Sequence, residues 1–123
     1  MLTLPRNNPV NYVLCNQTVT VYHRTDGGEI TATVHDRAFF DFQKNEVTHR
    51  TGSRETNGFL LVIPGDTLMV HPGDKVILGV GPTIATREDW AAFIPSKVPG
   101  LVVIKDVDPK YWDGRMVHVE AGG

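Results

Sequence analysis

The sequence predicts a mainly β fold, a small antiparallel β-barrel or sandwich with one short helix at about 86–94 and a long hairpin loop at 43–58. Short apolar runs alternate with turn sequences along most of the chain, which is the pattern of an all-β domain. One window has the start and stop signals of a helix. The 123 residues make one ordinary domain, large enough to bury roughly two-thirds of the surface that its unfolded chain exposes.

The first 17 residues are expected to form an extended arm ahead of a single domain at 18–123. The arm holds two prolines and four asparagines without a regular period. We therefore expect it to gain order by lying on the body or on a neighbouring subunit. The apolar side chains expected to make this contact are Leu2, Leu4, Tyr12, Val13 and Leu14.

A first hairpin is predicted from residue 18 onward. Apolar and polar side chains alternate over 18–23 and again over 29–35, with the two-residue period of half-buried strands. Between them, Asp26-Gly-Gly28 supplies the positive backbone angles of a tight turn. The apolar positions of the two strands are Val19, Val21, Ile30, Ala32 and Val34.

Two further strands are expected on either side of the long loop. Ala38-Phe-Phe-Asp-Phe42 is short and rich in aromatic side chains, as strands are. The 16 residues of 43–58 include a single aliphatic side chain, Val47, so we expect a long, mobile hairpin loop. The run Phe59-Leu-Leu-Val-Ile63 is too apolar for a strand with one face in water, and it ends at Pro64.

The second half supplies the remaining elements. Thr67-Leu-Met-Val70 leads to the turn His71-Pro-Gly-Asp74, which precedes a strand at Lys75-Val-Ile-Leu78. Thr86 is a helix N-cap with Asp89 three residues on, and Pro95 limits this helix to about two turns.

The chain then closes with two more strands. The first runs from Leu101 to Val107, and a last hairpin ends at Val119. The turn sequences Asp108-Pro109 and Asp113-Gly114 are expected to frame that hairpin.

The composition excludes several classes of protein. A net charge of -2 with 21% charged residues is typical of a globular domain and does not mark a nucleic-acid binder. Cys15 is the single cysteine, so it forms no disulfide within the chain, and we expect a small buried side chain. No secretory signal or membrane span is evident, so we expect synthesis in the cytoplasm.

Catalytic and metal sites are not predicted. The five histidines show none of the spacings typical of zinc sites, so they are expected to be surface or hydrogen-bonded residues. Asp66, His71 and Asp74 lie close together around two turns, but neither serine of the chain has the setting of a nucleophile. Asp74 is better explained as a turn residue. The histidines are His23, His35, His49, His71 and His118.

The predicted loop at 43–58 is mildly basic within a mildly acidic chain. Its charges either remain solvated and inert, or they meet phosphate groups or an acidic partner. One copy would bind weakly, whereas a ring of copies would gain by multivalency. The side chains that would make this contact are Lys44, His49, Arg50 and Arg54.

Several short motifs, in their order and spacing, resemble a small protein family that tailed bacteriophages and prophages encode among their capsid and neck genes. The motifs cover most of the chain beyond Thr18. They are Val19-Thr-Val-Tyr22, Leu61-Val-Ile-Pro64, Pro72-Gly-Asp74 ahead of Val76-Ile-Leu-Gly79, Asp89-Trp90, and Asp113-Gly-Arg-Met-Val-His118.

The resemblance implies a virion protein of the phage neck, of the head-completion or head-closure type, similar to stopper subunits. Such proteins resemble small β-barrels arranged as rings, of twelve copies beside the portal complex and six nearer the tail. The implied partners are further copies of the chain, the adaptor and portal complex, tail-terminator or tail proteins, and double-stranded DNA in the channel. No enzymatic activity and no cofactor are implied.

In this family a long loop between two strands commonly projects into the channel, and residues 43–58 take that place here. The family pattern has an aromatic-rich middle without a long insertion in this region, so the length and basicity of 43–58 are particular to this sequence. Two alternatives stay open. One is a tail-terminator or minor capsid protein, and the other is a free monomeric binding module or enzyme.

Overall fold

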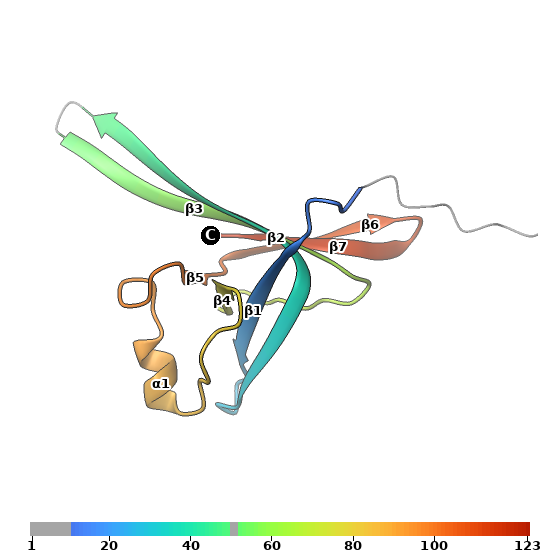
Figure 1. Cartoon of the computed structure of the whole chain (residues 1–123), viewed down its shortest axis with the longest axis horizontal. Coiled ribbons are helices and arrows are strands. Elements are labelled where there is room, and N and C mark those ends of the chain that lie inside the picture. The colour runs from blue at the N-terminus through green and yellow to red at the C-terminus, as the bar shows by residue number, and fades with distance from the viewer. Residues whose placement is uncertain (1–10, 50–51) are drawn as a thin grey trace, which may run out of the picture.

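A computed structural model of the chain describes residues 11–49 and 52–123, with side chains described for 11–42 and 58–123. Within these residues, seven antiparallel strands form one curled, half-barrel sheet with a single short helix beside it (Figure 1). The mainly β fold predicted from the sequence is therefore confirmed. No helix in the described part of the chain has the length and apolar character needed to cross a membrane.

The strands lie in the sheet order β5-β4-β1-β2-β3-β7-β6, and each neighbouring pair is antiparallel. The helix α1 (Arg87–Ala92) lies between β4 and β5 in the chain. The strand bounds are β1 (Gln17–Arg24), β2 (Ile30–His49), β3 (Gly52–Pro64), β4 (Lys75–Leu78), β5 (Val102–Val103), β6 (Asp106–Trp112) and β7 (Arg115–Gly122).

Strand β1, which lies between β4 and β2 in the sheet, is buried on both faces. Val19 and Val21 point into the main core, while Tyr22 on the other face is fully buried against Phe93, with ring centroids 4.8 Å apart. The strand predicted from the alternation over 18–23 is therefore confirmed as β1, but the prediction that it is half-buried is wrong. The polar face seen in the sequence is covered because α1 and the segments around it pack there.

The main core lies on one face of the curled sheet, opposite the face of β1 that carries Tyr22. It brings together side chains from β1, β2, β3, β4, β5 and β7, so one apolar cluster holds most of the sheet in a single curved layer. Its buried members are Val19, Val21, Ala38, Leu61, Ile63, Val70, Val76, Val102, Ile104, Met116, Val119 and Ala121.

The two edges of the sheet approach each other where the chain passes from β5 to β6. The amide of Ile104 donates to the carbonyl oxygen of Asp74, and the amide of the next residue, Lys105, donates to that of Gly122. Consecutive residues thus bond to segments next to β4 and at the end of β7. These two hydrogen bonds join the two edges of the half-barrel at the segment between β5 and β6.

The predicted helix is confirmed, with its expected cap. The Thr86 hydroxyl accepts a hydrogen bond from the Asp89 amide at 3.0 Å, and the Asp89 carboxylate accepts one from the Thr86 amide at 3.2 Å. These bonds hold the pKa of the Asp89 carboxyl below its usual value. Trp90 and Phe93 pack inward, as the sequence predicts.

Three local expectations differ from the structure. The segment expected as one strand at 101–107 forms β5 and the start of β6, with a break where the chain changes edges. Residues 67–70 form no strand, although Val70 is fully buried. Pro109 lies inside β6 rather than in a turn, and this is tolerated because β6 is an edge strand whose outer side needs no amide.

Candidate functional site

The most prominent feature of the fold is a two-stranded β2/β3 ribbon, residues 43–49 and 52–58, that extends away from the body (Figure 1). The hairpin at this position is confirmed, but the long loop predicted for 43–58 is wrong. The two strands of the ribbon pair in continuous register from Gln43↔Gly58 to His49↔Gly52. Seven residues at about 3.4 Å each give the ribbon a length of roughly 24 Å.

No other described strand supports the ribbon. Pairing between β1 and β2 reaches only to Gln17↔Ala38, and pairing between β3 and β7 reaches only to Leu60↔Gly122. An isolated two-stranded ribbon is marginally stable in water. The geometry therefore favours contact of the ribbon with another molecule.

The predicted contact residues of the loop fall on this ribbon. Lys44 pairs with Asn57, Arg54 pairs with Val47, and His49 pairs with Gly52. Arg50 lies outside the described residues, and the side chains of the other three lie outside the described part as well. The backbone thus places Lys44 near the base of the ribbon and His49 and Arg54 towards its far end.

The predicted N-terminal arm is described only from residue 11, so Leu2 and Leu4 lie outside the described residues. At the described end of the arm, Tyr12 contacts the body. The ring and hydroxyl of Tyr12 contact His118, with Oη 2.7 Å from Nδ1. Val13 and Leu14 are 69% and 66% exposed, so their side chains are accessible to a partner.

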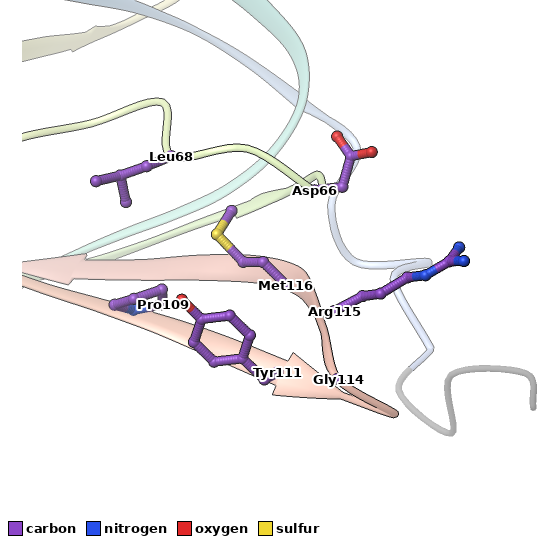
Figure 2. Close-up of a pocket in the computed structure, with 7 residues that line it drawn as sticks. All are labelled: Asp66, Leu68, Pro109, Tyr111, Gly114, Arg115 and Met116. Carbon is purple, nitrogen blue, oxygen red and sulfur yellow. The ribbon is translucent and has the colours of Figure 1, made fainter.

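A shallow groove lies along the edge of the sheet formed by β6. Figure 2 shows that its walls come from the β6/β7 hairpin and from the segment after β3. It has a volume of about 480 Å³, and Leu68 and Tyr111 beside it are 48% and 65% exposed. We call this the β6 groove; its lining is Asp66, Leu68, Pro109, Tyr111, Gly114, Arg115 and Met116.

The β6 edge is protected against direct addition of another strand. Pro109 lacks an amide, Lys110 carries a charge paired with Asp108 at 2.6 Å, and the register is irregular between Lys110 and Tyr111. Prolines, lysines and bulges of this kind blunt sheet edges in natural proteins. A partner at this edge would therefore contact side chains in the β6 groove rather than extend the sheet.

A second groove separates the β1/β2 hairpin from the loop at 79–85. Its volume is about 500 Å³, and Ile30, Ala32, Val34 and Val80 are among its lining residues. Val34 is 48% exposed and Val80 is 77% exposed. The apolar face predicted for the second strand thus lies in the β2 groove, as we name it, and is open to solvent.

A cluster of titratable side chains lies at the end of β1, away from both grooves. His23 Nδ1 is 2.6 Å from Asp74 Oδ1, and His71 Nδ1 is 3.6 Å from Asp74 Oδ2. The rings of His23 and His71 have their centroids 4.6 Å apart. One potential ligand atom from each residue lies within 4.8 Å of the others, so the three could hold a metal ion.

The sequence did not predict this cluster. Asp74 does act as a turn residue, since one carboxylate oxygen accepts from the His71 amide at 2.8 Å. The sequence gives no sign of His23, which comes from β1, 51 residues away. The signal that could have found it is strand register, because Tyr22↔Lys75 pairing puts His23 beside Asp74.

Two other candidates are resolved by the structure. Asp66 lines the β6 groove instead of joining His71 and Asp74, so the three residues that lie close in the sequence do not form one cluster. Cys15 is 7% exposed, and burial raises the pKa of its thiol despite the nearby positive charge of Arg37. The expected small buried side chain is confirmed.

Comparison of the chain with family models, with curated proteins and with solved structures gave no match. The geometry of the ribbon, the two grooves and the histidine cluster therefore carries the functional argument.

Proposed function

We propose that the chain is a structural subunit of a tailed-phage neck, of the head-completion or stopper type, which forms a ring between the portal-adaptor complex and the tail. The observation that carries the proposal is the unsupported β2/β3 ribbon. Its hydrogen bonds continue without a break from the body to the His49↔Gly52 pair, beyond the reach of β1 and β7. Such a ribbon gains stability when neighbouring molecules pack against it.

The charge of the ribbon supports DNA as one of its contacts. Residues 43–58 contain three lysine or arginine residues and two glutamates, within a chain of net charge -2. Each positive charge near a phosphate releases condensed counterions, and copies arranged in a ring multiply this effect. The residues proposed to face DNA or a partner are Lys44, His49, Arg50 and Arg54.

The grooves support assembly of the body. A ring needs two different surfaces on each subunit, because one copy's face meets another face of the next copy. The β6 groove and the β2 groove lie at separate places on the sheet, and both have exposed apolar side chains beside them. We assign these grooves, together with the N-terminal arm, to subunit contacts.

The proposal is tested in purified particles of a tailed phage that encodes the chain. Antibody labelling and electron microscopy are expected to place the protein at the head–tail joint, in a ring. Labelling at the distal end of the neck or on the capsid shell would instead favour a tail-terminator or a minor capsid protein. Absence of the chain from purified particles would overturn the assignment to the virion and favour a free monomeric protein.

A further inference from the structure

The turn before β4 presents His71 and Asp74 in a fixed arrangement. Pro72 and Gly73, with φ of 90° at Gly73, occupy the centre of the turn, and the Asp74 amide donates to the His71 carbonyl oxygen at 3.1 Å. The Gly73 amide donates to the Ile104 carbonyl oxygen at 2.7 Å, and the Ile104 amide donates back to Asp74 at 2.9 Å. The turn is thus held both by its own bonds and by the segment after β5.

Asp74 is oriented by burial. It is only 2% exposed, and a buried carboxylate needs close partners to offset its desolvation. His23 and the His71 amide provide two of them. Stabilising the buried carboxylate explains the position of the His23 ring and of the His71 backbone, but not that of the His71 ring. This ring lies against the His23 ring, with its Nδ1 3.6 Å from Asp74 Oδ2.

Solvent reaches the two histidines but not the aspartate. The His23 and His71 side chains are 35% and 46% exposed, against 2% for Asp74. An ion could therefore enter from the imidazole side and meet a carboxylate that is already positioned. Buried orienting groups of this kind reduce the ordering cost of forming a metal site.

We propose that His23, His71 and Asp74 form a binding site for one Zn²⁺ ion. Two imidazole nitrogens and one carboxylate oxygen suit zinc and related transition metals, whereas Mg²⁺ and Ca²⁺ favour sets made of oxygen alone. Three protein ligands leave a fourth position for water or for a group from a neighbouring molecule. The ion would link the end of β1 to the turn before β4, independently of the function proposed for the ribbon.

The test uses the full chain without an affinity tag, freed of metal by dialysis against a chelator. Titration with Zn²⁺ is expected to give one bound ion per chain by elemental analysis and a higher thermal unfolding midpoint, since binding to the folded state stabilises it. Co²⁺ is expected to give the visible absorption of a low-coordinate site. No bound ion and no shift in midpoint would overturn the proposal.

Single variants locate the site. His71→Gln and His23→Gln are expected to weaken Zn²⁺ binding at least tenfold, whereas His35→Gln, at a histidine outside the cluster, is expected to bind as the unmodified chain does. Equal losses in all three variants, or no loss in His71→Gln, would contradict the assignment. If a variant does not fold, NMR of the unmodified chain decides: Zn²⁺ must shift the ring signals of His23 and His71 and leave those of His118 in place.

Discussion

The hydroxyl of Tyr22 on β1 donates a hydrogen bond of 2.6 Å to the carbonyl oxygen of Pro82, in the loop that follows β4. A second bond beside it runs from the Thr20 hydroxyl to the carbonyl oxygen of Gly79 at 2.7 Å, and the Gly81 amide donates to the Thr20 hydroxyl at 3.0 Å. The loop at 79–85 is therefore fastened to the outer face of β1, and the approach is close at Gly81.

Gly81→Ala is the first prediction that follows from this contact. A methyl group at Gly81 would collide with the Tyr22 hydroxyl and with the Ile77 side chain. Since Tyr22 is fully buried, relief requires movement of the loop, and we expect a loss of about 1–3 kcal/mol in the free energy of unfolding. Urea denaturation measures the loss. Gly27→Ala is the control, because its nearest neighbour lies 3.8 Å away; equal stability of the two variants would contradict the packing described for the loop.

His35 gives the second prediction, a pH dependence of stability. Burial lowers the pKa of His35 from its usual 6.5, and the nearby Asp36 only partly offsets this. Its Nε2 atom is buried without a hydrogen-bond partner among the described residues, so the neutral ring is favoured in the folded state. The unfolded chain therefore takes up a proton at higher pH than the folded chain. Stability due to neutral His35 is present above pH 6.5 and is lost as the pH falls below it.

The measurement compares the unmodified chain with His35→Gln by denaturant unfolding between about pH 7 and about pH 5. The free energy of unfolding is expected to fall more steeply with acid in the unmodified chain. The other histidines are common to both proteins, so the difference between the two slopes isolates His35. Identical slopes would mean that His35 is not held neutral in the folded protein.

The third prediction concerns the charge of the ribbon. In phage particles, Arg50→Glu combined with Arg54→Glu is expected to leave assembly intact and to impair DNA retention or release, because both changes reverse positive charges of the 43–58 segment. Infectious titre and the DNA content of particles measure the effect. The control, Arg87→Glu with Lys97→Glu, applies the same charge change at two exposed positions away from the ribbon, one at the start of α1 and one after it. Unchanged titre in the ribbon variant would count against a DNA contact there.

The fourth prediction separates assembly from folding at the β6 groove. Leu68→Ser combined with Tyr111→Ser removes two exposed side chains, so we expect the free energy of unfolding to change by less than about 1 kcal/mol. Ring formation is expected to weaken because the apolar wall of the groove is lost. Light scattering measures the assembly and circular dichroism measures the fold. Val13→Ser, at an exposed side chain of the arm, tests whether the arm contributes separately.

Local side-chain chemistry predicted much of the fold. Thr86 and Asp89 mark the helix start because the cap is made within four residues, and Asp113-Gly114 marks the last turn because both residues adopt positive φ there. The ribbon could not be predicted in this way. Its strands are joined by backbone hydrogen bonds and carry few apolar side chains, so the alternation that reveals buried strands is missing.

The histidine cluster was hidden for a different reason. The spacing of residues along the sequence reveals metal ligands that share one turn, one helix or one hairpin, and it places His71 close to Asp74. His23 joins them only through the register of β1 against β4, which depends on the whole sheet. The same holds for the burial of β1 on both faces, since its outer cover comes from α1, far along the chain.

The continuity of β2 makes the ribbon and the core one mechanical unit. The strand runs for 20 residues; up to Ala38 it pairs with β1, and from Phe39 to His49 it pairs with β3. No loop or hinge interrupts it where the ribbon leaves the body. Because β2 is continuous from Ala38 in the hydrophobic core to His49, a force applied near His49 is transmitted along the strand to the core. Bending the ribbon therefore strains the curvature of the sheet.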